Sequence, residues 1–251
     1  MAQTTVPSSA APAGTFRVGG VFSRTFSLFP RTIAKFIVVS AVASLPTIVF
    51  SFYGAGATAN PSVRLIITAL AAVILAVLLN ALSQAAILYG AFQEMRGRPV
   101  SLMESLAKGL TRFLPVIGMS ICLGFGIMIG LILLIVPGII FWIMWSVAMP
   151  ACVVERRGPF NSMSRSQELT KGYRWTIFGI FLLVTIAGGI VQKGLEVLLL
   201  AIAGPIAAIV VLWVWQALFV LFEAILVIVI YHDLRVAKEG VDVEQIASVF
   251  D

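Results

Sequence analysis

Long apolar runs separated by short charged segments dominate the pattern of this 251-residue chain. A membrane-spanning helix needs about 20 apolar residues, because the hydrocarbon core is about 30 Å thick and a helix rises about 1.5 Å per residue. By that measure the runs predict six spans. Their expected bounds are 33–52, 63–92, 113–136, 138–154, 175–198 and 205–231. We therefore expect an all-α, polytopic membrane protein.

Glycine, proline and polar residues mark the expected breaks between spans. The segment GAGATANP (54–61) ends the first span. The stretch 113–154 is too long for one helix, and Pro137-Gly138 predicts a tight corner inside it, because proline lacks an amide hydrogen and glycine tolerates the turn. The last stretch must also cross twice, and its break is expected between Gln192 and Gly204.

Composition indicates one membrane domain, over residues 14–235. The chain is 60% hydrophobic and only 11% charged, whereas soluble domains carry about 25% charged residues. Residues 1–13 are rich in Ala, Ser, Thr and Pro and lack the order of a signal peptide, so a disordered tail is expected there. Residues 236–251 are expected to form a cytoplasmic C-terminal tail.

The positive charges lie mainly on one side of the predicted membrane. Fifteen of the 17 Lys and Arg residues flank the spans at that side, and only Arg64 and Lys193 lie on the other. Cytoplasmic loops carry the positive excess. We therefore predict a multi-pass protein of the bacterial cytoplasmic (inner) membrane with both termini in the cytoplasm.

A short segment of mixed character precedes each pair of spans, at 21–32, 101–112 and 161–175. In the middle one, Ser101 followed by Glu104 is a capping box, which predicts a helix start. Its leucines share one face and its basic residues lie off that face, which favours a helix in the membrane interface near anionic headgroups. The chain is then three repeats of amphipathic helix plus hairpin, unless the likeness among short apolar segments is chance.

Three motifs resemble a bacterial family of membrane domains. They are IVPGIIFW followed by Pro150 and Glu155, SRSQELTKGYRW at 164–175, and YHDLRVAKEGVD at 231–242. The family is the one found beside some glycerophosphoryl diester phosphodiesterases and also as stand-alone proteins. The resemblance implies this architecture and an association with lipids. It implies no catalytic residue, because a separate soluble barrel domain looks responsible for hydrolysis in the fused proteins. This chain resembles only their membrane domain.

Polar side chains inside the predicted spans are candidate functional residues, because they are costly in lipid. Asn80 and Gln84 lie one turn apart, and Gln216 lies two turns before Glu223. Gln84, Trp145 and Glu223 each stand ten residues before the acidic end of a hairpin, so we expect them at one depth, pointing inward. Glu223 could titrate as a proton or cation relay with the amides as ligands. Alternatively, a neutral Glu223 shares hydrogen bonds with Asn80 or Gln84 that hold the helices together.

Each hairpin ends in an acidic and a basic residue, in the pairs Glu94/Arg96, Glu155/Arg157 and Asp233/Arg235. These residues could bind lipid headgroups, or they could form ion pairs with one another at the cytoplasmic rim. We favour the ion pairs, which leave Arg156 and Lys171 to contact headgroups. The candidate rim or headgroup residues are Arg96, Arg156, Arg157, Arg165, Lys171, Arg174 and Arg235.

The glycines of GFGIMIG, Gly124, Gly126 and Gly130, follow no predicted strand, so a nucleotide loop is rejected. Gly126 and Gly130 instead favour close packing of helices.

Catalytic and metal-binding patterns are missing from the sequence, so we expect no enzyme activity, no metal and no cofactor. The one histidine, His232, has no companion ligand nearby, and Cys122 and Cys152 lack metal spacing. Nucleic acid is not an expected partner. The net charge is +6, but the basic residues that produce it flank the spans, where they anchor and orient the chain in the membrane. The expected partners are membrane lipids with anionic headgroups, with other proteins or a second copy of the chain as further options.

Two functions fit this pattern. The first is a non-enzymatic, lipid-associated scaffold or membrane-complex subunit, which the amphipathic basic segments favour. The alternative is a transporter or permeation protein that uses the cluster of Glu223, Gln84 and Asn80. A polar path to Glu223 from both membrane faces would favour transport, and a sealed apolar surrounding would favour the scaffold.

Overall fold

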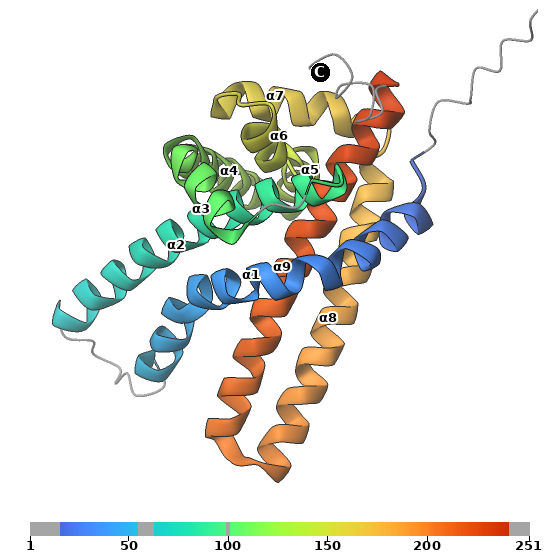
Figure 1. Ribbon diagram of the computed structural model, residues 1–251. Coiled ribbons are helices and arrows are strands. Elements are labelled where there is room, and N and C mark those ends of the chain that lie inside the picture. The colour runs from blue at the N-terminus through green and yellow to red at the C-terminus, as the bar shows by residue number, and fades with distance from the viewer. Residues whose placement is uncertain (1–15, 55–62, 99–100, 241–251) are drawn as a thin grey trace, which may run out of the picture.

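The computed structural model describes residues 16–54, 63–98 and 101–240, and these residues form nine α-helices and no strand (Figure 1). Six stretches among them are long and apolar enough to cross a membrane. The prediction of an all-α, polytopic protein with six spans is confirmed. The helices are α1 (Val18–Gly54), α2 (Val63–Met95), α3 (Leu102–Thr111), α4 (Phe113–Leu133), α5 (Ile135–Met144), α6 (Ala148–Val154), α7 (Pro159–Thr170), α8 (Arg174–Ile202) and α9 (Gly204–Glu239).

The helices follow the repeating order of short segment plus hairpin. Helix α3 precedes the pair formed by α4 and α5–α6, and α7 precedes the pair α8 and α9. The first unit differs from the expectation, because its amphipathic segment does not form a separate helix. It continues into the first span as the 37-residue helix α1, although Pro30 and Pro46 lie inside it.

Helix α3 begins where the capping box predicts. The Ser101 side chain accepts a hydrogen bond from the backbone N–H of Glu104, with a donor–acceptor distance of 3.1 Å. The helix packs on α2 through its small residues Ser105 and Gly109, and a Cβ on Gly109 would lie 3.1 Å from the backbone nitrogen of Ala86. Leu110 is exposed, so part of the leucine face points away from the protein.

The corner between α4 and α5 lies earlier than predicted. Leu134 alone connects them, with an extended backbone (φ −171°, ψ 150°). Pro137 stands in the first turn of α5 rather than at the corner. The first turn tolerates proline, because its backbone N–H groups have no partner within the helix.

The last hairpin turns at Ala203 and Gly204, inside the range that was expected. Gly204 has a φ of +80°, a conformation that glycine adopts at little cost. Helix α9 continues past the predicted domain end at residue 235 as far as Glu239, and Gly240 caps it with a φ of +63°. The tail predicted at 1–13 lies outside the described residues, as does most of the predicted C-terminal tail.

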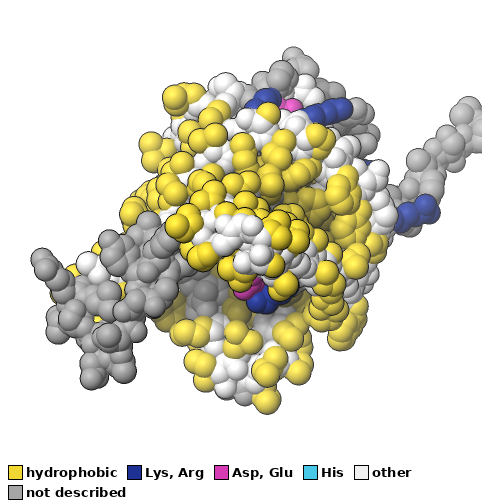
Figure 2. Space-filling model, turned by 90° about the horizontal axis from the view of Figure 1, so that it is seen from below, with side chains coloured by type: hydrophobic (Ala, Val, Ile, Leu, Met, Phe, Trp, Pro, Cys, Tyr) yellow, Lys and Arg dark blue, Asp and Glu magenta, His cyan; other side chains and the backbone are white. Residues whose placement is uncertain are grey.

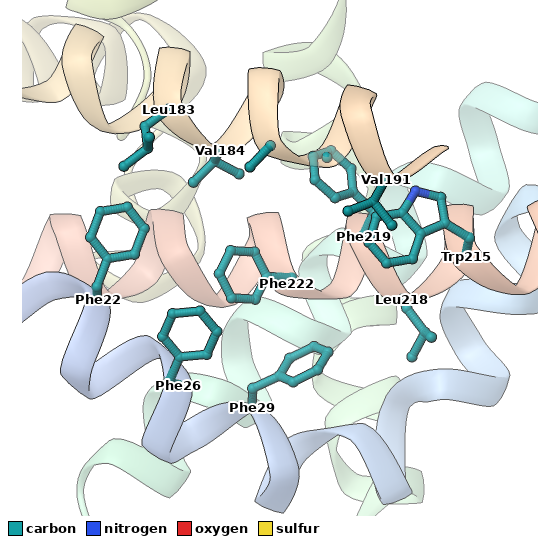
Figure 3. Close-up of a pocket in the computed structure, with 12 residues that line it drawn as sticks. Phe22, Phe26, Phe29, Leu183, Val184, Val191, Trp215, Leu218, Phe219 and Phe222 are labelled. Atoms are coloured by element: carbon teal, nitrogen blue, oxygen red, sulfur yellow. The ribbon is translucent and has the colours of Figure 1, made fainter. Parts of the chain in front are cut away.

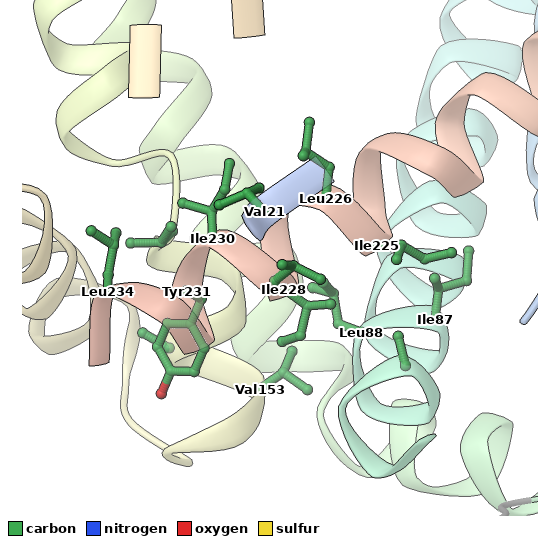
Figure 4. Close-up of a cluster of buried hydrophobic side chains, with 14 of the residues drawn as sticks. Val21, Ile87, Leu88, Val153, Ile225, Leu226, Ile228, Ile230, Tyr231 and Leu234 are labelled. Atoms are coloured by element: carbon green, nitrogen blue, oxygen red, sulfur yellow. The ribbon is translucent and has the colours of Figure 1, made fainter. Parts of the chain in front are cut away.

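Helix α9 is the central helix of the bundle, and it contacts α1, α2, α6, α7 and α8. Its second half is buried almost all round, with Leu221, Ile225 and Ile230 among the fully buried residues. Figure 4 shows Ile225 and Ile230 in one cluster with Val21 of α1 and with Ile87 and Leu88 of α2. The core therefore forms where the three hairpins meet around one helix.

The outer surface of the bundle is apolar. Large aliphatic side chains are exposed along α2, α4, α8 and the first half of α9. Viewed from below, the molecule is mainly hydrophobic, with charged side chains in a few small groups (Figure 2). A soluble monomer rarely exposes apolar patches on this scale, whereas a helix in lipid must expose one.

Candidate functional site

A cavity of about 330 Å³ lies between α2, α4, α5–α6 and α9. Apolar side chains form most of its wall. Its polar lining residues are Asn80, Gln84, Ser146 and Glu223. Two indole rings, those of Trp142 and Trp145, complete the lining.

This cavity brings together side chains that the repeat spacing places at one depth. Gln84 of α2, Trp145 at the end of α5 and Glu223 of α9 all line it, and so does Asn80. Gln216 does not. It is exposed on α9 and is not among the residues that line the cavity.

The polar groups around the cavity are incompletely paired. The amide nitrogen of Asn80 donates to the carbonyl oxygens of Ala76, at 2.9 Å, and Ala43, at 3.3 Å. Within the described part of the chain, the Glu223 carboxyl has neither a hydrogen bond nor an ion pair. The indole nitrogen of Trp145 and the hydroxyl of Ser146 are buried and also lack partners there. Unpaired polar groups in an apolar surrounding are costly, so these groups are candidates for contact with a ligand or with water.

A break in the fourth span places Trp145 and Ser146 at the cavity. Helix α5 ends at Met144 and α6 begins at Ala148, although one continuous span over 138–154 was expected. Pro150 explains the break, because a proline ring clashes with the carbonyl four residues earlier and offers it no N–H. That carbonyl belongs to Ser146. The proline was visible in the sequence, but its effect on this span was missed.

One end of the bundle carries the charged rim, which we define as Glu94, Glu155 and Asp233 with the basic side chains that pair with them. Glu155 is its most connected acid. It forms ion pairs with Arg157, at 2.8 Å, and Arg165, at 3.0 Å. It also accepts a hydrogen bond of 2.7 Å from the hydroxyl of the buried Tyr231.

Arg165 of α7 joins two helices at this rim, because it pairs with Glu239 of α9 as well as with Glu155. Burial by itself would lower the pKa of Arg165, but Glu239 and Glu155 outweigh that effect and raise the pKa above its ordinary value. Arg235 adds to the network through Glu239, at 3.1 Å, and its guanidinium lies 5.8 Å from the ring centre of Tyr231.

The other two acids of the rim pair with α1. Glu94 pairs with Lys35, and Asp233 pairs with Arg24. The three acidic–basic pairs were expected to pair among themselves. Glu155 contacts Arg157 of its own pair and also Arg235 of another hairpin end, whose Nε lies 4.0 Å away. Glu94 and Asp233 instead take partners from the first amphipathic segment and the start of the first span. In each case the acid holds a hairpin end to a neighbouring helix.

The remaining candidate rim residues are placed less tightly. Arg156 and Lys171 are exposed, and Arg156 has a φ of +56°. Arg96 and Arg174 are half-buried, and the Arg174 Nε has no hydrogen-bond partner in the described residues. The described residues contain no group of three or more His, Cys, Asp or Glu side chains that could hold a metal ion.

A second hollow, the aromatic groove, lies between α1, α8 and α9 and has a volume of about 540 Å³ (Figure 3). Its aromatic lining residues are Phe22, Phe26, Phe29, Trp215, Phe219 and Phe222. Aliphatic residues and Gly188 of α8 and α9 form the rest, so no charged side chain lines it. Sequence reasoning missed this groove, because its α1 wall lies more than 150 residues before its α8 and α9 walls in the chain.

Residues 100–234 match the family described as Domain of unknown function (DUF7847). The chain belongs to this family. The matched DUF7847 region begins just before α3 and includes Glu155, Glu223 and Asp233, whereas α1 and α2 precede it. No curated protein and no solved structure matches the chain.

Proposed function

We propose that this protein is a non-enzymatic, lipid-binding scaffold of the bacterial cytoplasmic membrane. The aromatic groove carries the proposal. Its volume of about 540 Å³ falls within the range of roughly 300–1,000 Å³ of ligand pockets, and its apolar lining suits a hydrocarbon chain.

The position of the groove favours a lipid acyl chain over other apolar ligands. Its walls belong to three helices that are long and apolar enough to span the membrane, so acyl chains surround its opening. Phe26 and Phe29 of α1 both pack against Phe222 of α9, with ring centres 5.4 and 5.6 Å apart. These contacts give the groove a rigid wall, which reduces the entropy lost when a flexible chain is ordered.

A basic residue near one end of the groove suits an anionic headgroup. Phe16 contacts Tyr173, with ring centres 5.3 Å apart, so the start of α1 lies beside the start of α8. Lys171 is exposed two residues before that tyrosine and forms no ion pair with the described residues. A lipid whose tail lies in the groove would therefore find a cation on the same side of the membrane.

The surroundings of Glu223 support the scaffold over a transporter. One turn nearer the charged rim than Gln84, Trp145 and Glu223, the cavity lining consists of Leu88, Met149 and Val227. All three are apolar. Apolar lining on the side of the cavity that faces the rim favours a sealed site over a polar path to that face.

Filling the groove tests the proposal. Ala187 is exposed and lines the groove, so Ala187→Trp should fill it and remove most of the lipid that co-purifies after mild detergent extraction. Ile186 is exposed on the same helix but is not among the lining residues, so Ile186→Trp should retain the wild-type amount. Native mass spectrometry of the bound lipid measures both. Equal lipid in the two variants would show that the groove is not the lipid site.

The proposed orientation puts the charged rim and both termini in the cytoplasm. Arg98 and Lys193 are exposed on opposite sides of the predicted membrane. With Cys122 and Cys152 replaced by alanine, a membrane-impermeant maleimide added to spheroplasts should label Lys193→Cys and spare Arg98→Cys. Labelling should reverse when inverted vesicles are used. The opposite pattern in spheroplasts would invert the topology.

The resemblance of three motifs to the membrane domains beside glycerophosphoryl diester phosphodiesterases is consistent with this function. All three motifs supply rim residues: the first ends at Glu155, SRSQELTKGYRW carries Arg165, and YHDLRVAKEGVD carries Asp233 and Arg235. In the proposal, these residues join helices around a lipid site and perform no hydrolysis.

A further inference from the structure

The cavity around Glu223 has chemistry that lipid binding does not use. It lies between α2, α4, α5–α6 and α9, whereas the aromatic groove lies between α1, α8 and α9. None of the residues that line one hollow lines the other. The cavity therefore stands as a separate candidate site.

Charge in this cavity is unbalanced. Glu223 is the only ionisable side chain that lines it, since the other lining residues are apolar side chains, two amides, a serine and two tryptophans. The lining thus offers a carboxyl and supplies no cation from the described part of the chain. A carboxylate in an apolar surrounding is stabilised by a positive partner close by.

The other polar groups favour the same kind of partner. Both hydrogen bonds of the Asn80 side chain use its amide nitrogen, so its side-chain oxygen remains an acceptor. The Gln84 side chain adds a second amide oxygen at the cavity. Trp142 and Trp145 supply indole rings, which attract cations through their negative faces.

The apolar part of the wall selects among cations. Leu123, Ile127 and Val220 offer no oxygen ligand, whereas a hard metal ion needs six or more. An organic cation can instead place an apolar body against them and its charge beside Glu223. At about 330 Å³ the cavity is near the small end of ligand pockets.

We propose that this cavity is a binding site for a small organic ammonium ion with an apolar body, held by Glu223 and the indole rings of Trp142 and Trp145. Asn80 and Gln84 orient the charged group through their oxygens. The proposal is independent of the lipid site, so failure of either leaves the other standing.

Equilibrium dialysis of radiolabelled benzyltrimethylammonium against the full chain in lipid nanodiscs tests the site. Wild-type protein should bind it saturably, and Glu223→Gln, which keeps the shape of the side chain, should weaken binding by roughly 30-fold or more because the charge is lost. Glu196→Gln is the matched control. Glu196 is a carboxylate of α8 that pairs with Lys193 and does not line the cavity, so binding should be unchanged.

Two further measurements keep the test decisive. Neopentylbenzene has the same shape as benzyltrimethylammonium and no charge, so it should not compete. Trp142→Leu should weaken binding by removing one ring while Glu223 stays in place, which covers the case in which Glu223→Gln fails to fold. The proposal is wrong if the wild type shows no saturable binding, if neopentylbenzene competes equally, or if a folded Glu223→Gln binds as tightly as the wild type.

Discussion

Replacing Glu155 with leucine is expected to lower the free energy of unfolding by about 3–5 kcal/mol, the usual result of removing one partner from a buried ion pair. The Glu155 side chain is only 10% exposed, and Arg165 is 15% exposed. Without Glu155, the Arg165 Nε loses its acceptor. The hydroxyl of Tyr231, a fully buried residue, loses its acceptor as well.

Glu168→Leu is the control for this effect, because Glu168 pairs with the same arginine. Its side chain is 68% exposed and its oxygen lies 3.9 Å from Arg165, so its loss should cost about 0–1 kcal/mol. Unfolding both variants by titrating SDS into mixed micelles, followed by circular dichroism, measures the difference. Equal losses of stability would mean that the rim network does not depend on Glu155.

Replacing Gly130 with alanine is expected to destabilise the α4–α5 hairpin by about 1–3 kcal/mol, the typical cost of overpacking. A Cβ on Gly130 would lie 2.8 Å from the Cα of Gly138 and 2.8 Å from the Phe141 ring. The first of these is backbone, so it cannot turn aside. The two helices would have to separate along their line of contact.

Gly124→Ala provides the matched comparison on the same helix. A Cβ on Gly124 would have nothing within 4 Å, so the change should be neutral or stabilise the helix by up to about 1 kcal/mol. The same SDS titration compares the two variants. If Gly130→Ala were as stable as Gly124→Ala, the close approach of α4 and α5 would not be needed for folding.

The sequence predicted the packing role of these glycines but not their partners. The four-residue spacing of Gly126 and Gly130 indicates a face that lets another helix approach, and that much is local information. Gly126 lies against Trp145 and Gly130 against Gly138. Those partners depend on a corner at Leu134, which the sequence placed three residues later.

The candidate sites were predicted to different extents. Repeat spacing placed Gln84, Trp145 and Glu223 at one depth, because equal distances along a helix give equal height and rotation. Gln216 was grouped with Glu223 for a different reason, its place two turns earlier on the same helix face, and it does not line the cavity. The period of one helix does not specify where a cavity beside it ends. The break at Ser146 was missed, although Pro150 held the information.

By itself, the sequence determined the number of spans and the charge asymmetry between the two sides of the membrane. Both properties depend only on the length and polarity of continuous segments, so no knowledge of neighbours is needed. Tertiary structure alone decided which charges pair and where the hollows lie. Asp233 finds Arg24 across 209 residues, and the aromatic groove forms only where α1 crosses α8 and α9. Such contacts depend on how rigid helices pack in three dimensions, which the period of a single helix does not specify.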